Sequence, residues 1–334
     1  MATAAVAALA LAGCGSATTD DPAPAEPAAS AAEPAITVVT STNVYGAIAT
    51  AVGGERVAVE SLIDDPSADP HSYESTPADA ATVAGGDIVV FNGGGYDAFM
   101  PGLIESAGGE RTAIEVADVS GLVPEGEEPH AEGESHAEGE AHAEGEEHSQ
   151  EGEGHSHGAF NEHFWYSLPA MKQLATDLAA QFGTADPEGA SEYTANAERF
   201  GEAVDGLVTK VEAIGAAHGG DRVAVTEPLP GYLLEAARLT DATPPEFSEA
   251  VEEDTDPPAA VLQQTLALFE GDPVRVLVLN GQTETPTTDQ VRQAAEAAGV
   301  PVVEMTETLP EGTIDYVSWM SGQIDALAAA LDRA

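Results

Sequence analysis

A chain of 334 residues, of which 43% are hydrophobic, is long enough for two domains of ordinary size, each with its own core. Only 5% of the residues are aromatic, so Ala, Val and Leu have to fill most of that core. Ten Lys and Arg against 59 Asp and Glu give a formal charge of −49, which repels nucleic acids and anionic lipid surfaces and attracts cations. This charge argues against a nucleic-acid partner, although solubility alone also explains it.

The first 35 residues predict a signal and a linker rather than a domain. A short apolar run ends in Leu11-Ala12-Gly13-Cys14 and cannot span a bilayer as a helix. It resembles the cleavage box of a bacterial lipoprotein, and no disulfide competes for Cys14, the only cysteine. No Lys or Arg precedes the run, which a start codon assigned too far downstream would explain. We expect a truncated signal peptide at 1–13, lipid on Cys14 and a flexible tether at 14–35; the alternative is an Ala-rich N-terminus with a chance Cys.

From Ile36 onward, strand and helix signals alternate. Apolar, β-branched runs predict strands at 36–40, 57–63, 87–92 and 112–116. Ser41-Thr42-Asn43 caps a helix to about residue 52, and Thr76-Pro77 with Asp79 opens another. This alternation predicts a parallel sheet covered on both faces, with ligands beyond the carboxyl ends of its strands. The three glycines at 93–95 lack the spacing of a nucleotide-binding loop and predict a tight turn.

The stretch 125–158 is of low complexity, rich in Glu and Gly. Six of the nine histidines lie in it, four of them at intervals of six residues: His130, His136, His142, His148, His155 and His157. Dense like charge and frequent Gly predict disorder. Imidazoles and carboxylates together bind divalent cations, but a flexible loop loses chain entropy when it wraps an ion. We interpret it as an auxiliary, low-affinity metal loop; an acidic linker with incidental His is the alternative.

The second half repeats the α/β pattern after two helices. Helices are predicted at 168–182 and at 186–217, the latter roughly 45 Å long at 1.5 Å per residue, which suits a strut between two lobes. Strands follow at 222–226, 274–280 and 301–305, with helices at 231–239, 257–269, 286–298 and 315–331. We therefore expect an N-terminal lobe at 36–185, a linking helix at 186–217 and a C-terminal lobe at 218–334.

Four potential metal ligands lie where predicted strands and loops reach the ligand edges of these lobes. His71 follows the second strand, and His163 follows the low-complexity stretch. Glu227 and Glu307 follow two strands of the second lobe. Two imidazoles and two carboxylates form a suitable set of ligands for one divalent transition metal between the lobes.

The order of these segments resembles the metal-binding solute-binding proteins of bacterial zinc and manganese ABC importers. Asp69-Pro70-His71-Ser72-Tyr73-Glu74 is similar to that family's D-P-H-x-Y-E segment, and His163-Phe164-Trp165 to its H-x-W motif. Thr226-Glu227 resembles the third-ligand segment and Thr306-Glu307 the fourth. The resemblance implies two α/β lobes joined by one long helix, no enzymatic activity, and a partnership with a permease and its ATPase. It also implies a lipid-anchored monomer on the extracytoplasmic face of the cell membrane.

Two substitutions depart from the family pattern. Glu162 stands where Pro is usual before the second His, and Glu307 is longer than the usual Asp. Glu227, where zinc-type members carry His, favours manganese, whereas the His-rich stretch favours zinc, which we take as the ion because it also accepts carboxylate oxygen. A metal-binding adhesin or a zinc buffer without a permease is a further alternative. A metal-dependent hydrolase is disfavoured because no HExxH motif is present and four protein ligands leave little room for a substrate.

Overall fold

The computed structural model describes residues 34–66, 68, 70–109, 111–123 and 160–334. The predicted signal peptide, Cys14, the tether up to residue 33 and the stretch 125–158 with its six histidines lie outside these residues, so those interpretations stay predictions. Among the described helices, none has both the length and the apolar character needed to cross a membrane.

Four parallel strands form the first sheet, in the order β2-β1-β3-β4. They are β1 (Ile36–Thr42), β2 (Val57–Ile63), β3 (Ile88–Phe91) and β4 (Thr112–Glu115), each within two residues of its predicted bounds. Val38 of β1 pairs with Val59 of β2 on one side and with Ile88 of β3 on the other. Because the strands are parallel, their carboxyl ends meet at one edge, where the loop that carries His71 begins.

The helices of this half are α1 (Asn43–Gly53), η1 (Gly54–Arg56), α2 (Pro77–Gly85), α3 (Phe99–Ala107) and α4 (Val116–Ser120). At the start of α2, the Thr76 side chain accepts from the backbone of Asp79, whose carboxylate accepts from the Thr76 N–H, which confirms the predicted cap. The sequence did not predict α3 and α4: α3 contains Pro101 and Gly102, and α4 has only five residues.

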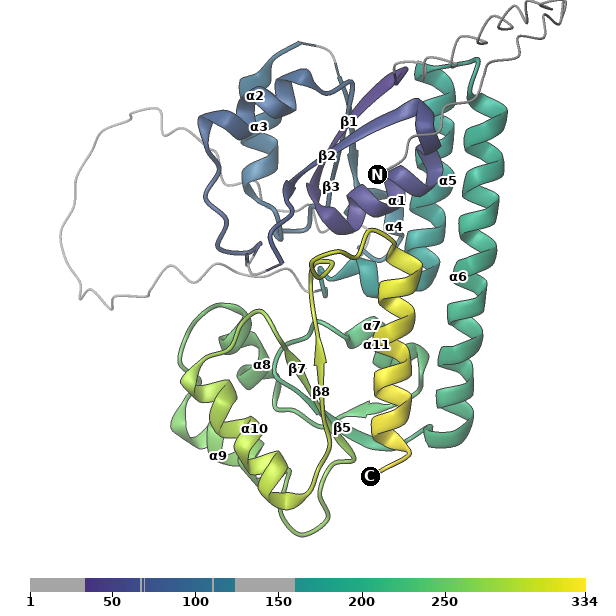
Figure 1. Ribbon diagram of the computed structural model, residues 1–334. Coiled ribbons are helices and arrows are strands. Elements are labelled where there is room, and N and C mark those ends of the chain that lie inside the picture. Colours follow the sequence, from purple (N-terminus) through teal and green to yellow (C-terminus); the bar gives the residue numbers. More distant parts are fainter. Residues whose placement is uncertain (1–33, 67, 69, 110, 124–159) are drawn as a thin grey trace, which may run out of the picture. The chain divides into compact units, whose positions relative to one another are not determined.

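Two long helices follow a short turn, η2 (Phe164–Tyr166). They are α5 (Leu168–Ala185) and α6 (Ala190–His218), whose 29 residues extend roughly 44 Å. Helix α6 begins at Ala190 rather than at the predicted residue 186, because residues 186–189 form a turn in which the Gly189 N–H donates to the Asp186 carbonyl. Along its length α6 packs against α1 and α5 of the first half and against α11 and α7 of the second (Figure 1).

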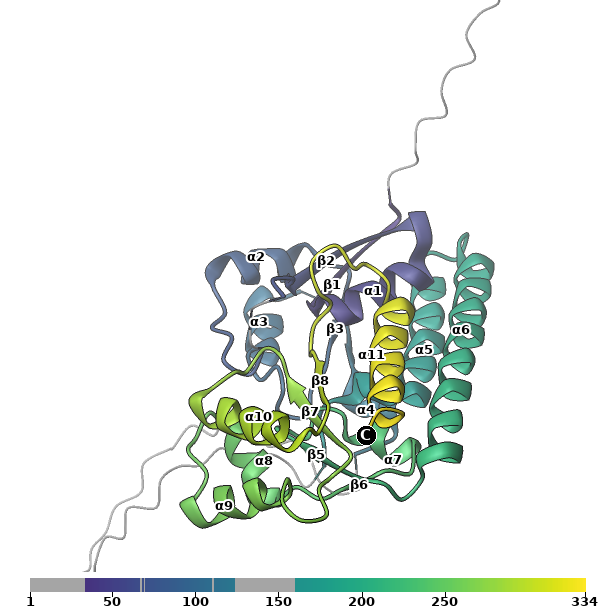
Figure 2. The ribbon, with the colours of Figure 1, turned by 60° about the horizontal axis from the view of Figure 1, so that its bottom comes forward.

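The second sheet is also parallel, in the order β6-β5-β7-β8. Its strands are β5 (Arg222–Val225), β6 (Thr240–Asp241), β7 (Val276–Asn280) and β8 (Val302–Met305). Its helices are α7 (Gly231–Ala236), α8 (Pro245–Glu252), α9 (Ala259–Ala267), α10 (Pro286–Ala298) and α11 (Tyr316–Leu331). The short elements β6 and α8 were not predicted. Figure 2 shows α8, α9 and α10 on one side of this sheet and α11 on the other.

Alternate residues along each strand enter different cores. Val276 and Val278 of β7 join a large core that also takes side chains of the first sheet, α5, α6 and α11. Leu277 faces a separate core with α8, α9 and α10. Both faces of each sheet are thus covered, and the predicted fold class, two α/β lobes each with a parallel sheet, is confirmed. The boundaries predicted between lobes and linking helix stay predictions.

Candidate metal-binding site

The structure brings three of the four predicted ligands together. His71 lies in the loop after β2, His163 directly before η2, and Glu307 two residues after β8. One ligand atom from each of these side chains lies within 4.8 Å of the other two. The distance from His71 Nε2 to Glu307 Oε2 is 3.7 Å, and the two imidazole centroids are 5.8 Å apart. His163 and Glu307 are buried, whereas 13% of the His71 side chain is exposed, so a path to solvent passes His71.

Asn161 sets the tautomer of His163. The Asn161 amide nitrogen donates to the Pro228 carbonyl at 2.7 Å, and its Oδ1 accepts from the His163 backbone N–H at 2.9 Å. These two contacts assign the amide orientation, so the 2.7 Å contact between Oδ1 and His163 Nδ1 places the ring hydrogen on Nδ1. In the neutral imidazole, Nε2 is then the nitrogen that can ligate a metal.

Glu162 plays the corresponding part for His71. Its Oε1 lies 3.2 Å from His71 Nδ1, and only 3% of the residue is exposed. The carboxylate of Glu162 thus lies on the Nδ1 side of the ring, and Nε2 lies 3.7 Å from Glu307 Oε2. The Asn92 side-chain amide donates to the Glu162 carbonyl at 3.0 Å and holds this segment beside the end of β3. The sequence showed Glu162 only as a departure from the family pattern, and its contact with His71 could not be read from spacing.

Glu307 is held by two hydrogen-bond donors that the sequence did not identify. The Asn280 amide donates to Oε1 at 2.7 Å, and the Tyr96 hydroxyl donates to Oε2 at 2.8 Å. Tyr96 follows the glycine turn 93–95, in which all three residues have positive φ angles, as the tight-turn prediction requires. Burial and the charge of Glu307 hold the pKa of Tyr96 well above its ordinary value, so the hydroxyl stays a donor.

Glu227, the fourth predicted ligand, lies beside this group but outside the three-residue cluster. Asn280 links it to the cluster, because the same amide nitrogen donates to Glu227 Oε2 at 2.6 Å and the Asn280 Oδ1 accepts from the Gln282 N–H at 3.0 Å. The Thr283 hydroxyl donates to the other oxygen of Glu227. Burial, followed by the charge of Glu307, raises the pKa of Glu227 to about 7, although both hydrogen bonds act in the opposite direction.

Glu252, the last residue of α8, is a further carboxylate of the site. Its Oε1 lies 3.7 Å from His163 Nε2, and only 6% of its side chain is exposed. Glu252, Glu162 and His71 form a second group whose ligand atoms lie within 4.8 Å of one another. Burial, followed by the charges of Glu162, Glu227 and Glu307, raises the pKa of Glu252 to about 9. The sequence did not indicate this residue, since α8 itself was not predicted.

Gln282 ties the loop of His71 to the loop of Glu307. Its amide nitrogen donates to the carbonyls of Pro66 at 2.9 Å and Ala68 at 3.2 Å, and it lies 2.9 Å from the Thr308 hydroxyl. Its Oε1 accepts from the backbone N–H groups of Glu307 and Thr308. One side chain from the second sheet therefore positions a loop of the first sheet.

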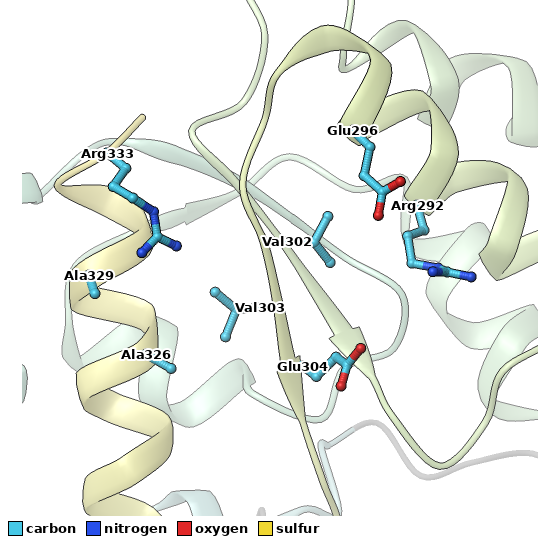
Figure 3. A pocket seen from close by; sticks show the side chains of 8 residues that line it. All are labelled: Arg292, Glu296, Val302, Val303, Glu304, Ala326, Ala329 and Arg333. Atoms are coloured by element: carbon cyan, nitrogen blue, oxygen red, sulfur yellow. The ribbon is translucent and has the colours of Figure 1, made fainter.

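A separate hollow, of about 470 Å³, lies between α10, β8 and α11 (Figure 3). Arg292 and Glu296 of α10, Glu304 of β8 and Arg333 are among the residues that line it, and none of the predicted ligands does.

His218, at the end of α6, contacts Asp221 at 3.2 Å and Asp332 at 3.1 Å, and these contacts fit its interpretation as a helix-end residue.

Comparisons with a family model and with individual proteins both find proteins of metal uptake or metal binding. The model of one protein family, described as the periplasmic component A of the zinc-uptake complex, matches residues 38–330. A high-affinity zinc uptake system protein of Brucella abortus is 33% identical over 186 residues, which cover 51% of this chain and 54% of that protein. A manganese-binding lipoprotein of Halalkalibacterium halodurans is 22% identical over 163 residues, 49% of this chain and 44% of that protein. The chain thus matches about half the length of these relatives.

Solved structures share the fold. A periplasmic zinc-binding protein from Treponema pallidum superposes with a TM-score of 0.67 at 18% identity, covering 89% of this chain and 99% of that one. A mutant of a laminin-binding adhesin from Streptococcus agalactiae gives a TM-score of 0.67 at 16% identity, with the same coverage. At these identities the likeness concerns the fold alone.

Proposed function

Since the chain belongs to the family of periplasmic zinc-uptake components, we propose that it is the extracytoplasmic substrate-binding protein of an ABC importer. In this proposal it captures one divalent transition-metal ion, zinc in the first place, and delivers it to a membrane permease driven by an ATPase. The observation that carries the proposal is the convergence of His71, His163 and Glu307, with ligand atoms within 4.8 Å of one another. Glu227 is the proposed fourth ligand, one hydrogen-bonded side chain away.

The residues around the site support the capture of a cation. Asn161 and Glu162 hold the Nδ1 side of the two rings, so both can offer Nε2. Asn280 and Tyr96 hold Glu307 before any ion arrives, which lowers the entropy lost on binding. Each imidazole must be neutral to ligate, so protons compete with the ion for both rings. Helix α6 packs against both halves, which favours small loop and lobe shifts over a wide hinge closure.

The remaining parts of the proposal concern residues outside the description. In this proposal, lipid on Cys14 anchors a monomer at the membrane through the tether, and the acidic stretch with six histidines gathers cations. Manganese is the alternative ion, favoured by the carboxylate of Glu227 and by the similarity to a manganese-binding lipoprotein. Adhesion is a second candidate role, because a structural neighbour is a laminin-binding adhesin.

Competition against a chromophoric zinc chelator tests the site in the full chain. We expect His71→Ala to abolish the tight site and leave only weak binding. His218→Ala is the matched control, since that histidine pairs with two aspartates away from the cluster and should keep wild-type affinity. Unchanged tight binding in His71→Ala would remove the cluster from the proposal.

Two further measurements separate the alternatives. Elemental analysis of protein purified without added metal distinguishes zinc from manganese. Uptake of the ion by cells that lack the gene, with the wild-type or the His71→Ala gene supplied, distinguishes transport from adhesion or buffering, because only transport requires both the gene and the site.

A further inference from the structure

We propose that Glu252 is an additional ligand of the captured ion, a third carboxylate besides Glu227 and Glu307, in contact with His163. The inference deepens the proposed function and depends on it. Glu252 lies in α8, a helix that the sequence patterns did not predict. As a ligand it gives the site more oxygen donors than the four predicted ligands provide.

Helix α8 aims Glu252 inward. Phe247, Ser248 and Val251 form the buried face of the helix, and Glu252, four residues after Ser248, continues that face. Phe247 and Val251 pack into the core that α8 shares with α9 and α10, which fixes the rotation of the helix. Glu249 and Glu253, on other faces, are exposed. Of three acidic residues in five positions, the packing selects one for burial.

Glu252 and His163 are placed so that both could bind one metal ion. Asn161 accepts the Nδ1 hydrogen of His163, so in the neutral ring Nε2 presents a lone pair toward Glu252 Oε1, 3.7 Å away. A separation of 3.7 Å is too long for a hydrogen bond between these two atoms. Two atoms bound to one zinc at about 2.1 Å lie about 3.4 Å apart at the tetrahedral angle, so a small movement brings both into one coordination shell.

The negative surroundings of Glu252 favour a bound cation. The charges that act on it are those of Glu162, Glu227, Glu307 and Glu253, all negative. Burying a carboxyl group among carboxylates is costly unless a proton or a cation compensates it. A dication in contact with His71, His163 and Glu307 would neutralise the neighbours of Glu252 as well as Glu252 itself.

One ion accounts for both groups of potential ligands. His71 belongs to both groups, and its two nitrogens could serve two ions only if the ring lost its remaining hydrogen. Glu162 already faces Nδ1 of that ring at 3.2 Å, so we assign Glu162 to orienting His71 and Glu252 to the ion.

The coordination number gives the proposal a distinctive test. Zinc is satisfied by four ligands, whereas manganese prefers about six, mostly oxygens. Loss of the Glu252 carboxylate should therefore weaken manganese binding more than zinc binding. We expect Glu252→Gln in the full chain to lower Mn²⁺ affinity about tenfold or more and Zn²⁺ affinity by less than about fivefold.

Glu253→Gln is the matched control, because it removes the same charge one residue further along on an exposed position. Competition titrations with Mn²⁺ and Zn²⁺ measure both affinities, and Co²⁺ absorption spectra report the coordination number, which should fall in Glu252→Gln only. Thermal unfolding without metal shows whether the variant folds. Should it not, Glu252→Asp, which keeps the charge but shortens the side chain, must lower Mn²⁺ affinity more than Zn²⁺ affinity.

Equal losses in Glu252→Gln and Glu253→Gln, or an unchanged Mn²⁺ affinity with an unchanged Co²⁺ spectrum, would overturn the proposal. Those outcomes leave the proposed function intact as long as His71→Ala still abolishes the tight site. Tight binding that survives His71→Ala would instead overturn the proposed function itself.

Discussion

Gln282→Glu tests whether the link between the two loops prepares the site. The substitution keeps the size of the side chain and the oxygen that accepts from Glu307 and Thr308, but it replaces the amide that donates to the Pro66 and Ala68 carbonyls. A carboxylate cannot donate to those carbonyls. The change therefore releases the loop of His71 and leaves the loop of Glu307 in place.

The magnitude follows from the bonds lost. Each of the two hydrogen bonds to the carbonyls contributes about 0.5–1.5 kcal/mol, so the loop loses about 1–3 kcal/mol of ordering free energy. If that free energy must be supplied again when His71 ligates the ion, zinc affinity falls about 5- to 150-fold. Amide hydrogens of residues 71–73 should also exchange faster in the metal-free protein.

The assay is the same chelator competition, combined with hydrogen exchange followed by mass spectrometry. Gln263→Glu adds an equal charge on an exposed position of α9 and should leave both readouts unchanged. Gln282→Met, which removes the hydrogen bonds without adding charge, should weaken binding as well. Wild-type affinity and wild-type exchange in both Gln282 variants would refute the role of this side chain in preparing the site.

Two further predictions concern a ring tautomer and a buried acid. Asn161→Leu should lower zinc affinity about 10- to 100-fold. Asn161→Asp should largely preserve zinc affinity, because the Asp side chain still accepts from His163 Nδ1. Equal losses of affinity in both variants would contradict the tautomer assignment. Burial raises the pKa of Asp97 from 3.8 to about 6, so its protonated form stabilises the fold at low pH, and this contribution is lost as the pH rises through about 6. Relative to Asp97→Asn, the metal-free wild type should lose roughly 2.5 kcal/mol of unfolding free energy between pH 4 and 7; parallel pH curves in urea denaturation would contradict this.

Local patterns predicted most of the fold. Strand β2 and helix α10 have their predicted bounds, because a largely apolar run specifies the former and a Thr-Pro start with a closing Gly299 specifies the latter. Elements α3, α4, β6 and α8 escaped prediction because they are short or contain Pro and Gly, so their stability comes from packing rather than from propensity.

The residues of the candidate site were also predicted only in part from the sequence. His71, His163 and Glu307 follow strands or motifs, and parallel strands carry such positions to one edge of a sheet, which is why their convergence could be expected. Asn280, Tyr96 and Gln282 act through hydrogen bonds across 25 to 216 positions of sequence, for which the chain offers no local signal.

The amino-acid sequence by itself determined the alternation of elements, the acidic charge and the residue types that can hold a cation, because these depend on composition and on short-range periodicity. Only the tertiary structure decided how the carboxylates lie around the two imidazoles. Glu227 and Glu252 are chemically identical, but the packing of their strand and helix gives one of them two hydrogen-bond donors and directs the other toward an imidazole.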